Sequence, residues 1–269
     1  MFSLDWKERF NKDAVNFCKN NIPKKDYDID LIYNAYPIRV QRKIPHEVVI
    51  YVAKKIADNL SGELSELTDF FDYLWTRKGE EGKLAFVTII SKKINLDSEF
   101  FLTYIQKLIF SDKDFNDLDI LFEKIVYPLL KKSSLKQIEN VLDWMKKGEE
   151  NLNFAIIKMI VRLIKADKSL LQPIFSRLES NWLVADELDI KLYSYFLKAT
   201  FKIDSDFYFS VYKRYEKTRE PNFVEILTNA ICAYNDQMFE SAEIWAQSGN
   251  IRLKKAGQSA LKLLKRKKK

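Results

Sequence analysis

A short acidic and aromatic stretch near the middle of the chain carries residue types that could do chemistry. Residues 112–122 read DKDFNDLDILF. Phe115 and Asp119 are four residues apart, so on a helix both side chains would project from one face, one turn from each other. An aromatic ring beside a carboxylate suits recognition of a nucleobase or chemistry on one.

The same stretch also suits an ordinary helix start. Asp114 could cap the backbone N–H groups of Asn116 and Asp117, and acidic side chains in a first turn complement the helix dipole. Capping accounts for Asp114 and Asp117, whereas Asp119 lies a turn further into the helix. Two interpretations of Asp119 therefore stay open, a structural one and a catalytic one.

A second aromatic candidate lies at Tyr195, within residues 189–198, DIKLYSYFLK. Leu192, Phe196 and Ala199 form an apolar stripe at three- and four-residue spacing, and Tyr195 falls beside it. Large aromatic residues at helical spacing usually belong to the core, as we expect for Trp75. For Tyr195 the pattern permits either a core position or one that faces a groove.

Several other kinds of site are excluded by residue counts and spacing. His46 is the only histidine, and it follows Pro45 in the first turn of a predicted helix, where we expect it to be exposed. A Ser–His–Asp arrangement therefore has no support, and no glycine-rich phosphate loop is present. The four aspartates between 112 and 119 are two or three residues apart and cannot all face one point on a helix. We expect neither a metal site nor a cofactor.

Helical periodicity runs through nearly the whole chain. Apolar residues recur at three- and four-residue spacing, and the chain has only six glycines and six prolines, too few to punctuate a many-stranded β fold. Antiparallel helix pairs at a period of roughly 35–40 residues are typical of a HEAT-like α-solenoid. We predict an all-α fold of about six such pairs in one domain, residues 1–269. The predicted helices span 4–21, 29–35, 45–59, 63–76, 80–94, 98–110, 116–131, 134–147, 151–165, 169–181, 187–202, 205–217, 222–234, 238–247 and 251 to the end.

The net charge of +7 is concentrated at the end of the chain. Residues 252–269 hold nine basic residues and no acidic one, and the remainder holds 36 basic and 38 acidic residues. A basic tail at 262–269 could attract phosphate groups through counterion release. It could equally keep a helix end soluble.

Cysteine usage and hydropathy predict the compartment. Cys18 and Cys232 are the only cysteines and are not arranged as a Cys-x-x-Cys pair, which favours a reducing environment. No apolar run reaches the roughly 18 residues that a membrane span needs. The start of the chain lacks the order of a signal peptide. We expect a soluble cytoplasmic protein without a membrane partner.

Three segments of the sequence resemble the AlkD-like family of HEAT-repeat alkylpurine DNA glycosylases. Residues 74–85, LWTRKGEEGKLA, are similar to the family's Leu-Trp, acidic, Leu-Ala helix pair. Residues 115–119, FNDLD, resemble its Trp-Asp-x-Val-Asp motif. Residues 189–198 are similar to its Lys-Ala-x-x-Trp-x-Leu-Arg pattern. The resemblance covers roughly residues 30–220.

The resemblance implies roles for individual residues. Asp119 takes the place of the catalytic carboxylate and Phe115 that of an adjacent tryptophan. Tyr195 takes the place of a second DNA-facing tryptophan, and Lys198 that of an arginine. One segment departs from the family, because Ala155 and Ile156 occupy positions where arginines are expected. Lys158 or Arg162 would have to substitute, from at least half a turn away.

The activity implied by the resemblance is excision of N3- or N7-alkylated purines from double-stranded DNA by a monomer. Such bases carry positive charge, so the glycosidic bond is already weakened and no general acid is needed. An ionised Asp119 would stabilise the oxocarbenium-like sugar and orient water. Phe115 and Tyr195 would pack against the backbone or the cationic base. The alternative is a non-catalytic HEAT-like scaffold that binds DNA or a protein on its concave face.

Overall fold

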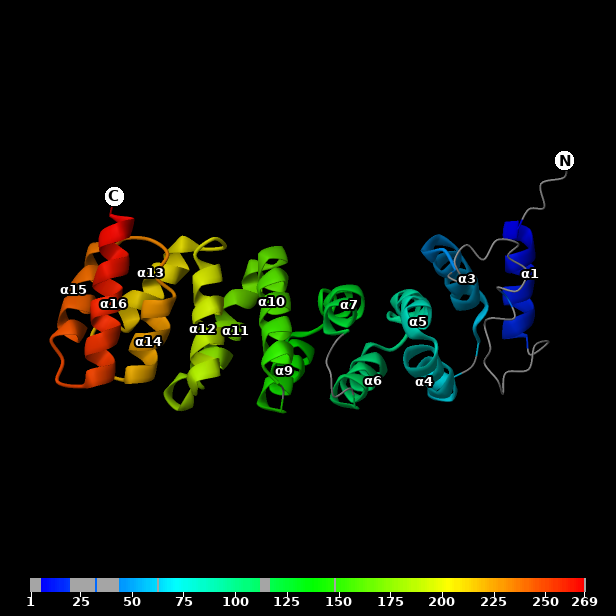
Figure 1. The fold of residues 1–269 in the computed structure, drawn as a ribbon, viewed down its shortest axis with the longest axis horizontal. Coiled ribbons are helices and arrows are strands. Elements are labelled where there is room, and N and C mark those ends of the chain that lie inside the picture. The colour runs from blue at the N-terminus through cyan, green and yellow to red at the C-terminus, as the bar shows by residue number, and fades with distance from the viewer. Residues whose placement is uncertain are drawn as a thin grey trace. The chain divides into compact units, whose positions relative to one another are not determined.

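A computed structural model describes residues 6–19, 32, 44–61, 63–111, 117–147 and 149–268. All regular structure in these ranges is helical, and they contain no β-strand (Figure 1). The predicted all-α class is therefore confirmed. The candidate residue Phe115 lies outside the described residues, and so does the predicted helix 29–35 apart from Ile32. The chain divides into two compact units, residues 1–132 and 133–269.

The first unit is built on a series of helices that pack on one another. Helix α1 packs on α3, α3 on α5, and α4 on α5. Tilted and edge-on ring contacts join Phe70, Phe71, Phe86 and Tyr104 in its core, and Trp75 packs on Phe86 with ring centroids 5.2 Å apart. The predicted burial of Trp75 is confirmed. The helices are α1 Trp6–Cys18, α3 His46–Asn59, α4 Thr68–Arg77, α5 Gly79–Lys93 and α6 Ser98–Ser111.

The predicted helix 116–131 is interrupted within its length. It consists of α7 Leu118–Leu121, a π-helical segment Phe122–Val126 and α8 Tyr127–Leu130. Pro128 has no N–H to donate to the carbonyl of Lys124, one turn earlier. The hydroxyl of Ser91 on α5 lies 3.0 Å from that carbonyl oxygen and can donate to it. A proline in mid-helix is therefore accommodated by a wider turn and a side-chain donor from a neighbouring helix.

The second unit contains two sets of helices. The even-numbered helices pack one on the next, α10 on α12, α12 on α14 and α14 on α16, and α13 packs on α12 and α15. Helix α15 packs closely on α16, and a Cβ atom at Gly257 would lie 2.3 Å from the backbone nitrogen of Ala246. Gly257 therefore sets the distance between these two helices. The helices are α9 Leu135–Asp143, α10 Glu150–Ala166, α11 Leu171–Glu179, α12 Glu187–Thr200, α13 Ser205–Arg214, α14 Pro221–Asn229, α15 Asp236–Ala246 and α16 Ile251–Lys267.

Side-chain caps mark the starts of several helices in the second unit. Ser134 and Gln137 form a capping box at the start of α9, and Asp186, Asp204, Asn235 and Asn250 cap later helices. The predicted helix 222–234, however, ends at Asn229. Tyr212 donates to the carbonyl of Leu227 at 2.6 Å, and Tyr208 lies 3.0 Å from that of Ala230. Buried hydroxyls thus satisfy the last carbonyls of α14.

Polar contacts between successive helix pairs recur at a nearly constant sequence separation. Arg177 donates to Asp143 at 2.7 Å across 34 residues, and Arg214 donates to Glu179 at 2.8 Å across 35 residues. In the first unit, Lys92 pairs with Asp58 across 34 residues. This separation agrees with the predicted period of helix pairs. Among the helices that the structure describes, none is long and apolar enough to cross a bilayer.

Candidate nucleic-acid interface

The acidic stretch that opens α7 holds two aspartates with different surroundings. Asp117 occupies the N-cap position of α7, but its side chain makes no capping hydrogen bond. It forms an ion pair with Lys83 of α5, whose ammonium lies 5.2 Å from the ring centroid of the buried Trp75. Asp117 therefore links α7 to α5, a contact that the sequence does not predict.

Asp119 is exposed on α7. Its carboxylate forms no ion pair and accepts no hydrogen bond from any residue within the described ranges. Of the two aspartates, Asp119 is thus the one whose carboxylate remains open to solvent. The predicted partner of Asp119, Phe115, lies outside these ranges.

The exposed side of α12 carries the second group of predicted residues. Tyr195 is 40% exposed, while its neighbours Leu192 and Phe196 are buried. The apolar stripe therefore fills the core, and Tyr195 lies outside it. Of the two positions that the sequence permits for Tyr195, the core position is excluded. Lys198 is exposed one turn after Tyr195.

The exposed side of α10 carries the other two predicted residues. Lys158 and Arg162 are exposed and lie three and seven residues after Ala155, so the three share one side of the helix. Ile156 is 0% exposed and belongs to the core. An arginine at position 156 would therefore be buried, whereas Lys158 and Arg162 are exposed residues.

A ring contact joins the two exposed helix sides. The rings of Phe154 on α10 and Tyr195 on α12 are T-shaped, with centroids 6.5 Å apart. Because α10 and α12 pack against each other, Lys158 and Lys198 belong to rows of exposed residues, here called stripes, on neighbouring helices. We call this surface the α10–α12 basic face, and it comprises Phe154, Lys158, Arg162, Lys165, Lys191, Tyr195, Lys198 and Lys202.

Charge is not distributed evenly along the α10–α12 basic face. At the start of α12, Lys191 pairs with Glu187 at 3.0 Å, and the pKa of Lys191 is raised by that hydrogen bond and by the charges of Glu187 and Glu150. In the second halves of α10 and α12, and just after α12, the exposed residues of this face are all basic: Lys158, Arg162, Lys165, Lys198 and Lys202. An anion would therefore be attracted to the end of the face that bears these five residues.

Four members of the α10–α12 basic face were not predicted from the sequence. One of them, Lys191, lies within residues 189–198 but was given no role there. Phe154, Lys165 and Lys202 lie outside the motifs on which the resemblance is based. A usable signal was present, because residues 158, 162 and 165 recur at helical spacing on one side. The same holds for residues 191, 195, 198 and 202.

The basic end of the chain forms the solvent side of α16. Leu253, Ala256, Ala260 and Leu264 are buried at helical spacing, so the lysines and arginines between them are exposed. Arg252 is engaged by Glu225 at 2.8 Å, and the ammonium of Lys268 lies 4.8 Å from the ring centroid of Tyr234. Residues 262–268 are therefore largely part of a folded helix.

Within the described ranges, no group of three or more His, Cys, Asp or Glu side chains is placed to hold a metal ion. His46 is exposed at the start of α3, as predicted. Comparison of the chain with models of known families, with curated proteins and with solved structures finds no match. The resemblance to the AlkD-like family thus stands on the three sequence segments alone.

Proposed function

We propose that the chain is a HEAT-like α-solenoid protein that binds double-stranded DNA through the α10–α12 basic face. The observation that carries the proposal is that Tyr195, Lys198, Lys158 and Arg162, each singled out from sequence, lie on the exposed sides of two adjoining helices. The repeat assignment is supported by the side-chain pairs that recur at separations of 34 and 35 residues.

The physical basis of binding is the release of counterions from the DNA backbone. Each phosphate that a lysine or arginine neutralises frees condensed cations, and this term makes affinity fall steeply with salt. Five basic side chains, three or four residues apart along each of two adjoining helices, can contact several phosphates at once. Tyr195 adds a flat, half-exposed ring against which a sugar or a base can pack.

Two double variants test the binding proposal. One replaces two lysines of the α10–α12 basic face by glutamine, and the control replaces two lysines elsewhere in the same unit. Lys158→Gln/Lys198→Gln removes two exposed charges from α10 and α12. Lys136→Gln/Lys213→Gln removes two exposed charges from α9 and α13 of the same unit. We expect the first pair to weaken duplex binding about tenfold or more, as two lost phosphate contacts would. Equal affinities for the two double variants would reject the face.

For catalysis we propose Asp119 as the carboxylate that assists excision of cationic alkylated purines. Support comes from its exposure on α7 and from the contrast with Asp117, which is held by Lys83. An N3- or N7-alkylated purine leaves as a neutral base, so the bond to the sugar breaks without a general acid. A carboxylate near the developing cationic sugar lowers the energy of that charge and can orient the attacking water.

Release of methylated purines from alkylated duplex DNA tests this catalytic role. Asp119→Asn removes the charge with little change of shape and is expected to lower the release rate about 100-fold, the size of effect seen when a transition-state charge partner is removed. Asp69→Asn, an exposed carboxylate on α4 of the same unit, is the matched control and should retain the wild-type rate. DNA binding by the wild-type chain without any release would favour the non-catalytic scaffold instead.

A further inference from the structure

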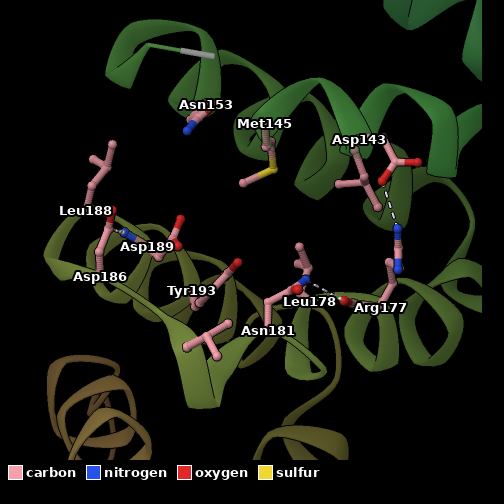
Figure 2. Close-up of a pocket in the computed structure, with 12 residues that line it drawn as sticks. Asp143, Met145, Asn153, Arg177, Leu178, Asn181, Asp186, Leu188, Asp189 and Tyr193 are labelled. Atoms are coloured by element: carbon pink, nitrogen blue, oxygen red, sulfur yellow. Dashed lines mark hydrogen bonds and ion pairs between the residues drawn. The ribbon is translucent and has the colours of Figure 1, made fainter. Parts of the chain in front are cut away.

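A cavity in the second unit lies apart from the α10–α12 basic face. It has a volume of about 300 Å³ and opens among α9, α10, α11 and α12 (Figure 2). This is the lower end of the range of roughly 300–1,000 Å³ that small-ligand sites occupy. None of the eight residues of the basic face lines it.

The polar wall of the cavity is acidic. Asp186 and Asp189 lie at the start of α12, where Asp186 caps the helix by accepting the backbone N–H of Asp189 at 2.8 Å. A third carboxylate, Asp143, is paired with Arg177 at 2.7 Å, so the one cationic residue of the lining is already engaged. Within the part of the chain that the structure describes, neither Asp186 nor Asp189 has a cationic side chain within ion-pair distance.

Asn153 enters the cavity from the opposite wall. Its side chain projects from α10 toward the space that Asp189 and Tyr193 enter from α12 (Figure 2). Asn153 is only 4% exposed, and its Oδ1 atom is buried without a hydrogen-bond partner among the described residues. Buried side-chain oxygens are nearly always satisfied, so this amide needs an explanation. Rotation about its last side-chain bond would turn either the oxygen or the nitrogen toward a ligand.

Tyr193 lies within the field of both carboxylates. Burial raises the pKa of its hydroxyl, and the charges of Asp189 and Asp186 raise it further. The hydroxyl therefore stays protonated and sits close to two negative charges. Partial burial also raises the pKa of Asp189, with a smaller contribution from the charge of Asp186. A positive group placed among these three residues would offset the negative charges of Asp186 and Asp189.

We propose that this cavity binds a small organic cation, an ammonium or guanidinium group carried on an apolar body. The cation would lie against Asp186 and Asp189, with the Tyr193 hydroxyl and the Asn153 amide as hydrogen-bonding partners. The apolar body would pack on the aliphatic part of the lining, Leu142, Met145, Leu178, Val184 and Leu188. Neither this site nor its test depends on DNA binding.

The test compares two probes that differ in charge. Benzylamine carries an ammonium group on an aromatic ring, and benzyl alcohol has nearly the same shape without the charge. Calorimetric titration of the full chain near neutral pH should show binding of benzylamine at least about tenfold tighter than binding of benzyl alcohol, the ratio that one charge-assisted contact supplies. Failure of benzylamine to bind, or equal affinity for the two probes, would overturn the proposal.

Variants locate the binding site of benzylamine. Asp189→Asn keeps the shape and removes one charge, and it should weaken benzylamine binding about tenfold or more. Asp206→Asn, an exposed carboxylate on α13, is the matched control and should bind as the wild type does. Leu188→Trp fills the cavity without changing its charge and should abolish binding, which decides the case if Asp189→Asn fails to fold. Wild-type affinity in Leu188→Trp would show that benzylamine binds elsewhere.

Discussion

The rings of Phe154 and Tyr195 meet edge to face, with centroids 6.5 Å apart, and thereby join the exposed sides of α10 and α12. Leu192 and Phe196, on either side of Tyr195 in the helix, are buried. The contact fixes Tyr195 at the surface, in the stripe of α12 that bears Lys198 and next to Phe154 on α10, the helix that bears Lys158. A half-exposed aromatic ring framed by lysines is a typical component of a surface that binds nucleic acid.

Truncation of this ring should weaken DNA binding without unfolding the protein. Tyr195→Ala removes the packing surface, and we expect duplex affinity to fall by about 1 kcal/mol, the lower range for an aromatic contact with nucleic acid. Tyr195→Phe retains the ring and should bind nearly as the wild type does. Fluorescence anisotropy measures both affinities. An affinity for Tyr195→Ala equal to that of the wild type would remove Tyr195 from the interface.

Replacement of Gly257 should destabilise the second unit. Alanine is the better helix former by about 1 kcal/mol, so Gly257→Ala would stabilise an isolated helix. In the folded unit the added Cβ would lie 2.3 Å from the nitrogen of Ala246, and α15 and α16 would have to separate. We expect a net loss of about 1–3 kcal/mol in the free energy of unfolding, measured by urea denaturation. An increase in stability would contradict this account of the contact.

Loss of a buried hydroxyl should destabilise the same unit. Tyr212 is buried and donates to the carbonyl of Leu227 at 2.6 Å. Tyr212→Phe leaves that carbonyl with one partner fewer, and we expect a loss of about 1–3 kcal/mol. Tyr234→Phe, at a partly exposed position, is the matched control. Equal urea midpoints for the two variants would count against a structural role for the Tyr212 hydroxyl.

Stability should decline at alkaline pH. Burial raises the pKa values of Tyr104, Tyr193, Tyr208 and Tyr212, and it helps to raise the pKa of Tyr215 to about 12. In the unfolded chain these hydroxyls ionise near pH 10, so above about pH 10 the unfolded chain binds fewer protons than the folded one. The free energy of unfolding then decreases as pH rises. Below about pH 9 these tyrosines are protonated in both states, so they do not make stability depend on pH.

Urea denaturation at a series of pH values measures this decline. The midpoint should be insensitive to these tyrosines up to about pH 9 and fall between about pH 10 and 11. Tyrosinate absorbance should show that a group of tyrosines ionises only when the chain unfolds. If all tyrosines ionise near their ordinary pKa while the chain stays folded, the buried hydrogen bonds of Tyr208 and Tyr212 do not form in solution.

Much of the fold could be predicted because local signals agree with the tertiary structure. The predicted helices 45–59, 80–94, 98–110 and 151–165 match α3, α5, α6 and α10 to within one residue at either end. The apolar spacing within these helices and the turn residues between them indicate the same boundaries.

Other features depend on contacts that are distant in sequence. The π-helical segment after α7 involves Ser91, 33 residues before Lys124, and the early end of α14 involves Tyr208 and Tyr212 on another helix. The ion pair that distinguishes the surroundings of Asp117 from those of Asp119 is formed with Lys83 on α5. Tyr195 was undecided because a tyrosine suits both a core and a surface position. None of these partners can be identified from local spacing.

The salt dependence of duplex binding tests the central claim most directly. Each phosphate contact contributes about 0.9 to the slope of log affinity against log salt concentration. If Lys158 and Lys198 each neutralise one phosphate, the slope for Lys158→Gln/Lys198→Gln will be smaller than the wild-type slope by about two, and the slope for Lys136→Gln/Lys213→Gln will be unchanged. Identical slopes for all three proteins would contradict the proposal that DNA lies on the α10–α12 basic face.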